Sequence, residues 1–170
     1  LERARHRLCF EEFLLIQLGV MKQRFSWQRE PGRPMVVDAG VVNSVVQALP
    51  FTFTAAQQRA LGDITTDLQR SYPMSRLLQG DVGSGKTVVA LVAMLVAVAN
   101  DMQAVMMAPT EVLAEQHHRT LTSMLQDVAD RLHMQQGMAA DLVSHTRVGL
   151  LRGSLSQAEK EERRCEIAAG

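Results

Sequence analysis

The residues best suited to chemistry are those at 80–87, which read GDVGSGKT. This string has the spacing G-x-x-x-x-G-K-[ST], in which glycines let successive backbone N–H groups turn toward a phosphate. Lys86 can reach the β- and γ-phosphates of a nucleotide as a point charge, and the hydroxyl of Thr87 can bind Mg²⁺. We therefore expect a phosphate-binding loop that consists of Gly80, Asp81, Val82, Gly83, Ser84, Gly85, Lys86 and Thr87.

A glutamine upstream of the loop could recognise the base of the nucleotide. In Thr54-x-x-Gln57, one interpretation is a capping box, in which the threonine caps a helix and the glutamine bonds back to the threonine N–H. The side-chain amide of Gln57 can also donate to N7 of adenine and accept from its N6 amine. Because the pair precedes a phosphate loop, we favour adenine recognition, and ATP is then the expected nucleotide.

A second candidate binding segment lies at 108–116 and reads APTEVLAEQ. It begins at the last residue of the apolar run 104–108. Thr110 is well placed to cap a helix that begins at Glu111. The segment is equally suited to binding a phosphate of nucleic acid. It places Pro109 and Thr110 at the end of a strand, beside the free N–H groups of a helix. The residues alone leave both interpretations open.

The elements that must position these residues alternate between helices and short apolar runs. Periodicity and capping signals predict helices at 4–25, 41–49, 54–68, 88–99, 111–133 and 156–169. Apolar runs predict buried strands at 74–79, 104–108 and 148–151, and we expect a loop at 134–146. Strands that alternate with helices indicate an α/β fold with a parallel sheet, flanking helices and right-handed crossovers.

Composition narrows the function classes only slightly. The formal charge is zero, so no global basic field favours nucleic acid. Cys9 and Cys165 lie far apart without partners at metal-ligand spacing, and the adjacent His117 and His118 would point to different faces of a helix. We expect no signal peptide and no membrane segment, because the longest apolar stretch, 88–99, is too short to span a bilayer.

The alternation stops at Gly170, where a further strand is expected. A parallel sheet of three short strands would leave much apolar helix surface uncovered. We therefore expect the sequence to be part of a larger domain.

The order of LPFTFTAAQQRAL, GDVGSGKT and MAPTEVLAEQ resembles the start of the motor domain of superfamily 2 helicases. The loop, with RLLQ before it, is most similar to the RecG family of bacterial ATP-dependent DNA helicases, which remodel stalled replication forks. The stretch ARHRLCFEEFLLIQLGVMKQR also resembles the connector that joins the wedge domain of this family to its motor. The resemblance implies a helical connector at 1–49 and, at 50–170, the incomplete N-terminal half of a first RecA-like ATP-binding domain.

The resemblance also implies roles for individual residues and partners. Gln57 would recognise adenine with support from Thr54, and the loop at 80–87 would hold the triphosphate and Mg²⁺, with Lys86 and Thr87 as catalytic residues. DNA-backbone contacts would fall to Pro109, Thr110 and Glu111. The partners would be branched or duplex DNA and the wedge and second motor domains of the same polypeptide, in the bacterial cytoplasm near the nucleoid.

The chain lacks two features of the family that matter for catalysis, one of which is the arginine finger that a second motor domain would supply. The family uses an Asp-Glu pair to complete the Mg²⁺ site, and no aspartate in this sequence is followed by glutamate. Because phosphoryl transfer depends on such groups for most of its rate, we expect little or no ATP hydrolysis by this chain alone. The alternatives are a transcription-repair coupling or primosomal translocase, a nucleotide-binding module without turnover, and an unrelated P-loop kinase.

Overall fold

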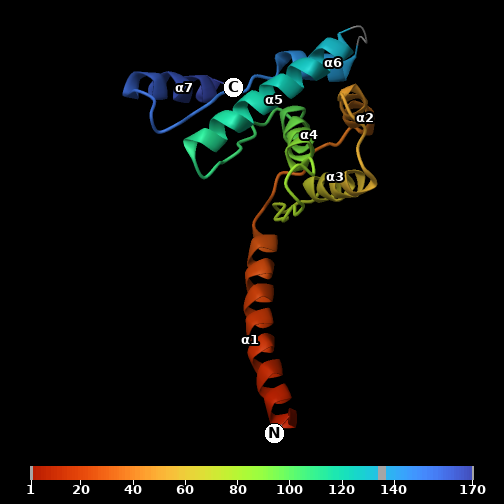
Figure 1. Cartoon of the computed structure of the whole chain (residues 1–170), viewed down its shortest axis with the longest axis vertical. Coiled ribbons are helices and arrows are strands. Elements are labelled where there is room, and N and C mark those ends of the chain that lie inside the picture. Colours follow the sequence, from red (N-terminus) through yellow and green to blue (C-terminus); the bar gives the residue numbers. More distant parts are fainter. Residues whose placement is uncertain (1, 134–136, 170) are drawn as a thin grey trace.

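The computed structural model describes residues 2–133 and 137–169, and these residues form seven helices (Figure 1). The predicted helices are all present, with boundaries that differ by a few residues. The helices are α1 (Glu2–Arg29), α2 (Ala39–Ala48), α3 (Ala55–Leu68), α4 (Lys86–Val98), α5 (Glu111–Leu132), α6 (Met138–His145) and α7 (Gln157–Ala169).

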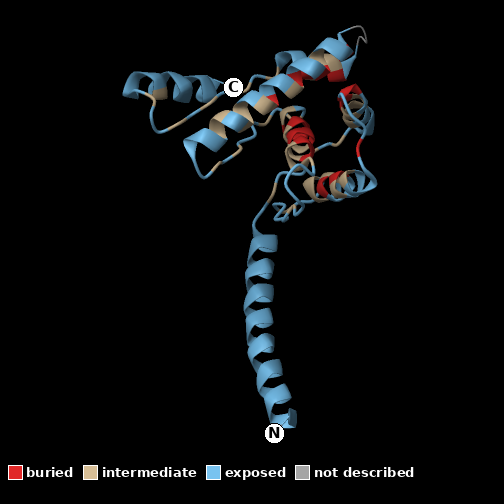
Figure 2. Cartoon of the chain, viewed as in Figure 1, coloured by how far each residue is buried: buried red, intermediate tan, exposed pale blue. Residues whose placement is uncertain are grey.

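The hydrophobic core is built around α4. This helix is apolar on all sides, and its buried residues include Val88, Val89 and Val92, each 1% exposed. Helices α2, α3, α5 and α6 all contact α4, and Figure 2 shows the buried residues on their facing sides. A helix that is apolar all round must be surrounded by other elements, which explains why α4 lies at the centre. The phosphate loop therefore leads directly into the most buried helix of the molecule.

The three predicted strands do not form among the described residues. Residues 74–79, 104–108 and 148–151 run as extended or irregular connections, and no backbone hydrogen bond joins any of these three segments to another of the three. A strand needs a neighbouring strand to bond its N–H and C=O groups, and an apolar run cannot supply that neighbour by itself. The prediction of a parallel sheet is thus not met within the part of the chain that the structure describes.

The loop expected at 134–146 was a wrong prediction for most of its length. Residues 134–136 lie outside the described residues, but α6 occupies Met138–His145. Ala139 and Val143 are four positions apart and both are buried against the core. The helix was overlooked because it is short and because Gly137, at its N-cap, provides no side-chain cap.

The first helix stands away from the other elements and has no buried residue (Figures 1 and 2). The linker after α1 is nevertheless bound to the core elements. Gly32 donates its N–H to the carbonyl of Ser71 at 2.8 Å. Val36 forms two hydrogen bonds with the Asn100 side chain just beyond α4, at 2.7 and 2.9 Å. No helix within the described ranges has both the length and the apolar character that crossing a membrane requires.

Candidate nucleotide-binding site

The loop at 80–87 wraps around the side chain of its own lysine. Lys86 is the first residue of α4, and its ammonium donates to the carbonyls of Gly80 and Asp81 at 2.8 and 2.7 Å. The hydroxyl of Ser84 lies 3.5 Å from the same nitrogen. All three partners are neutral acceptors, so the loop concentrates an uncompensated positive charge at its centre. Anionic oxygens bind an ammonium more strongly than neutral acceptors do, which makes this position suited to a phosphate.

Gly85 is required where the loop meets α4. Its φ is +80°, in the left-handed region that side chains rarely adopt. A Cβ on Gly85 would also lie 2.3 Å from Nε2 of Gln57, so the end of this side chain would have to shift. The loop can therefore keep its path beside Gln57 only with glycine here.

Several backbone donors of the loop and of the first turn of α4 have no partner among the described residues. They are the N–H groups of Gly83, Gly85, Lys86 and Thr87. The hydroxyl of Thr87 likewise forms no hydrogen bond with any described residue, although Thr87 is half-buried. Free N–H groups at the start of a helix, beside a lysine, form a suitable site for a phosphate. Residues that could hold a triphosphate and a magnesium-bound hydroxyl are thus gathered at one place.

Asp81 and Val82 lie at the exposed tip of the loop. Both are exposed, and Val82 has no contact that would bury it. Within the described residues no group of three or more His, Cys, Asp or Glu side chains is arranged to hold a metal ion by itself. A metal at this site would therefore depend on Thr87 and on the phosphates of the ligand.

The capping box predicted at the start of α3 is confirmed. Gln57 donates its backbone N–H to the Thr54 hydroxyl at 3.2 Å, and Thr54 donates its N–H to Oε1 of Gln57 at 2.8 Å. The same Gln57 side chain donates through Nε2 to the carbonyl of Ser84 at 2.9 Å. Gln57 thus caps its helix and touches the phosphate loop with one amide, so the two interpretations of this residue are compatible.

Two contacts of the loop region were not predicted from the sequence. One is the Gln57–Ser84 bond, and the other is the position of Arg76 between Asp63 and Asp67 of α3. A signal for the second was present in the sequence, because the two aspartates are spaced four residues apart on a predicted helix and an arginine lies just before the loop.

The third predicted segment, at the start of α5, is bound to a different neighbour. Thr110 caps α5 by accepting the N–H of Leu113 at 3.3 Å, as one interpretation of the sequence required. The carboxylate of Glu111 accepts the N–H of Ser154 at 2.9 Å. Hydrogen bonding from Ser154, helped by the charge of Arg152, lowers the pKa of Glu111. Pro109 is exposed beside them. This segment is therefore connected to residues 152–154 and not to the phosphate loop.

An open pocket of about 230 Å³ lies next to this segment and is lined by Glu115, His118, Arg119, Leu150 and Arg152. Glu115 forms ion pairs with both arginines, so both guanidinium groups are already bound to the one carboxylate of the pocket. His118 contacts the carbonyl of Val148 at 3.1 Å through Nε2. The pocket contains no residue of the phosphate loop, and we do not assign the nucleotide to it.

Comparison with known proteins tests the predicted resemblance. The sequence matches the DEAD/DEAH box helicase family over residues 54–153. The ATP-dependent DNA helicase RecG of Synechocystis sp. is 38% identical over 171 residues, which is 100% of this chain and 19% of that protein. RecG of Haemophilus influenzae is 47% identical over 114 residues, which is 67% of this chain and 16% of that protein.

A solved structure agrees with these relatives. The structure of RecG bound to a three-way DNA junction matches 99% of this chain with a TM-score of 0.81 and 34% identity. The match covers 21% of that RecG chain, so the present chain spans only a small part of the relatives that it matches. The predicted similarity to RecG is confirmed. Since the family match extends over more than half of its residues, the chain belongs to the DEAD/DEAH box helicase family.

Proposed function

We propose that the chain is the nucleotide-binding part of an ATP-dependent DNA helicase that remodels branched DNA. The observation that carries this proposal is the loop around Lys86, in which a positive charge and free backbone donors lie together at the start of the most buried helix. The similarity to RecG over nearly the whole chain supports the choice of a helicase over a small-molecule kinase. The chain spans 19% of such a relative, so the helicase activity that we propose is that of a longer protein that includes this chain.

In this proposal each loop residue has a separate task. The N–H groups of Gly83, Gly85, Lys86 and Thr87 hold the oxygens of the phosphates, and Lys86 exchanges its carbonyl partners for the β- and γ-phosphates. Thr87 would hold Mg²⁺ through its hydroxyl, and the metal would neutralise charge that develops on the transferred phosphoryl group. The free hydroxyl and free N–H groups of the loop fit these ligands.

Gln57 can recognise adenine without giving up its present bonds. An amide oxygen has two lone pairs and an amide nitrogen has two hydrogens. One of each is used, for the N–H of Thr54 and the carbonyl of Ser84. The remaining lone pair and hydrogen match the N6 amine and N7 of adenine, so we assign base recognition to Gln57 and the support of its amide to Thr54.

We also propose that the three extended segments are strands of a parallel sheet in the complete helicase. Leu78, Met106 and Val148 pack against the core from these segments. Their neighbours point away from it: Leu77 is 86% exposed, Val105 is 83% exposed and Met107 is 90% exposed. Alternation with a period of two is the pattern of a strand with one covered face. The second face and the edge bonds would then be covered by other parts of the helicase, as in a RecA-like motor.

The parts outside the nucleotide site complete the proposal. We assign α1 to the connector between wedge and motor, and we expect the motor part to begin with α2, because Val45 and Ala48 of α2 are buried in the shared core. The DNA backbone would run along Pro109, Thr110 and Glu111. In the cell, the helicase would act near the bacterial nucleoid. The related RecG structure is bound to a three-way DNA junction, which supports branched DNA as the substrate.

A nucleotide-binding module without turnover is the second candidate. It would be favoured if the 170 residues were the complete protein in the cell, because no aspartate of this sequence is followed by glutamate. Hydrolysis in the presence of DNA, measured on a full-length protein that includes this chain, separates the two candidates, since a module of this kind would bind ATP and leave it intact.

The proposal is tested with Lys86→Ala and the matched control Lys22→Ala, which removes an exposed lysine from α1. Loss of hydrogen bonds to a charged ligand should weaken binding of magnesium-ATP to the chain by about tenfold or more, as measured by calorimetry, while Lys22→Ala binds normally. In a full-length protein that includes this chain, Lys86→Ala should also abolish DNA-stimulated hydrolysis. Equal binding by both variants would contradict the site assigned to Lys86.

A further inference from the structure

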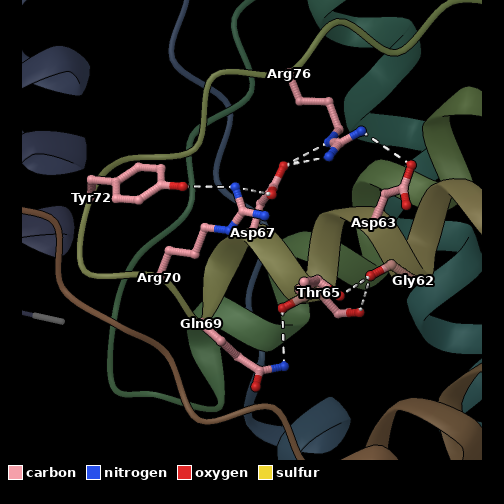
Figure 3. A network of polar contacts seen from close by, with 9 residues as sticks. Gly62, Asp63, Thr65, Asp67, Gln69, Arg70, Tyr72 and Arg76 are labelled. Atoms are coloured by element: carbon pink, nitrogen blue, oxygen red, sulfur yellow. Dashed lines mark hydrogen bonds and ion pairs between the residues drawn. The ribbon is translucent and has the colours of Figure 1, made fainter. Parts of the chain in front are cut away.

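Arg76 lies between two carboxylates of α3, four residues before the phosphate loop begins. Its Nε donates to Oδ2 of Asp67 at 2.8 Å, and a terminal nitrogen of the same guanidinium lies 2.6 Å from this oxygen. The other terminal nitrogen donates to Asp63 at 3.2 Å. Figure 3 shows the guanidinium pointing toward α3 and reaching both aspartates. One side chain therefore joins the segment ahead of the loop to two turns of the helix.

Asp67 is the centre of a larger network in the same place (Figure 3). Its second oxygen lies 3.1 Å from Arg70, and Arg70 donates to the Tyr72 hydroxyl at 2.8 Å. The guanidinium of Arg70 also lies 5.6 Å from the centre of the Tyr72 ring. The Asp67 side chain is only 13% exposed, while Arg76 is 35% exposed. A carboxylate that is shielded from water and shared by two arginines holds its partners more firmly than a surface ion pair does.

The two ends of the phosphate loop are bound to the same helix. At the end of the loop, Gln57 in the first turn of α3 donates to the carbonyl of Ser84. Before the start of the loop, Arg76 is bound to Asp67, near the last turn of α3. Gln57 and Asp67 are ten positions apart in the sequence, which is about 15 Å along a helix. Helix α3 thus bridges the loop and fixes the distance between its two ends.

This arrangement matters because the loop has few other restraints. Its residues are mostly exposed, and two of its glycines have positive φ angles. The bonds within the loop are the Ser84–Asp81 turn, at 3.2 Å, and the contacts of the Lys86 ammonium. A glycine-rich segment loses much conformational entropy when it is ordered, so any ordering that precedes ligand binding improves affinity.

We propose that Arg76 is a positioning residue of the phosphate loop, which holds the loop against α3 in the form that receives ATP. This role rests on the proposed binding of ATP at the loop. Arg76 does not touch the nucleotide in this proposal, and it acts through the path of residues 77–80. Loss of its two ion pairs releases the start of the loop while the bond between Gln57 and Ser84 still holds the end.

The test compares Arg76→Gln, Arg76→Lys and the control Arg59→Gln in the full 170-residue chain. Arg59 is an exposed arginine on α3 that forms no ion pair with the described residues. Arg76→Gln should weaken binding of magnesium-ATP about fivefold to thirtyfold, the equivalent of ordering one more residue on binding. Arg76→Lys keeps the positive charge but loses the planar guanidinium that bonds both aspartates, so its affinity for magnesium-ATP should lie between those of Arg76→Gln and the unaltered chain. Arg59→Gln should bind magnesium-ATP as tightly as the unaltered chain.

Hydrogen exchange makes the test independent of nucleotide binding. In Arg76→Gln the amide of Ser84, which donates to the carbonyl of Asp81 within the loop, should exchange faster, whereas the amides of α4 and α5 should keep their protection. Normal exchange in the loop, or ATP binding as tight as in the unaltered chain, would overturn the inference. Faster exchange throughout α4 and α5 would also overturn it, since Arg76 would then support the whole fold. If Lys86→Ala binds ATP normally while Arg76→Gln loosens the loop, the site assignment fails and the positioning role stands.

Discussion

Helices α4 and α1 are both rich in apolar residues, yet their surroundings are opposite. Of the residues of α4, seven are buried, whereas none of the residues of the much longer α1 is buried. Helix α4 is enclosed by four other helices, and α1 contacts none of them along its length. The comparison teaches that apolar content predicts a helix but does not determine what covers it.

The pattern of α1 explains how a helix can be apolar and exposed at once. Two rows of apolar side chains run along it, one through Phe13 and Ile16 and the other through Leu14 and Met21. All four are exposed, between 43% and 67%. Exposed apolar surface of this extent on a helix marks a contact surface, which agrees with the connector role that we propose for α1.

A matched pair of leucine substitutions should show the largest difference between the two regions. Leu132 in α5 is 2% exposed and Leu15 in α1 is 70% exposed. Leu132→Ala should lower the free energy of unfolding by about 2–5 kcal/mol, because it leaves a cavity in the core. Leu15→Ala should change it by less than about 0.5 kcal/mol. Urea unfolding of both variants measures this. A similar loss in both would mean that α1 is packed in solution.

A pair of glycine substitutions tests the joint between the two regions. A Cβ on Gly32 would lie 2.5 Å from the backbone of Tyr72, whereas one on Gly19 of α1 would meet nothing within 4 Å. Gly32→Ala should therefore destabilise the chain by about 1–3 kcal/mol through overpacking. Gly19→Ala should increase the helix content of α1, because alanine favours the helical state over glycine by about 0.5–1 kcal/mol of free energy.

Circular dichroism during thermal unfolding separates these two effects. The midpoint of the main transition should fall for Gly32→Ala and stay constant for Gly19→Ala. An unchanged midpoint for Gly32→Ala would show that the linker is not held against the turn after α3, and the comparison between a bound linker and a free helix would then fail.

The smallest expected effect concerns α7, which resembles α1 in having no buried residue. Polar bonds attach it instead, such as that from Gln103 to the carbonyl of Ile167 at 2.6 Å. Glu111 holds the segment before α7 through Ser154, and hydrogen bonding lowers its pKa below 4.5. A lowered pKa stabilises the folded state above pH 4.5, and the contribution is lost as the pH falls through the lower folded value.

The stability difference between the unaltered chain and Glu111→Gln should therefore be constant at neutral pH and shrink in acid. Urea midpoints from about pH 6 to about pH 3 bracket the titration of carboxyl groups. Glu12→Gln, which removes an exposed carboxylate from α1, is the control and should give no such change. A difference that does not vary with pH would exclude the bond between Glu111 and Ser154 as a support of this segment.

The helices of the fold could be predicted because their signals are local. Thr54 with Gln57, and Ser156 with Glu159, form the capping boxes that the sequence indicates. Helix α6 could not be predicted in this way, because it is stabilised by Ala139 and Val143, which pack against other helices. The strands depend even more on distant partners, because a strand satisfies its backbone only through its neighbours.

The same distinction holds at the site. The phosphate loop could be recognised because its chemistry lies in consecutive residues. The bond from Gln57 to Ser84 and the ion pairs of Arg76 could not be foreseen in detail, since both depend on how α3 lies against the loop. Spacing along the chain indicates which residues share a helix face, but it does not show which distant carbonyl or arginine that face will meet.

The bound linker has a mechanical consequence for α1. At 1.5 Å per residue, the 28 residues of α1 make an arm of about 42 Å. Its inner end is joined through the linker to Ser71, within the turn that leads to Arg76, and to Asn100 beyond α4. By lever geometry, a rotation of about five degrees at this joint moves the far end of α1 by about 4 Å, roughly the spacing of two Cα atoms. A rotation this small, at a joint bonded to the segment ahead of the phosphate loop, is enough to shift the contacts of the tip by one residue.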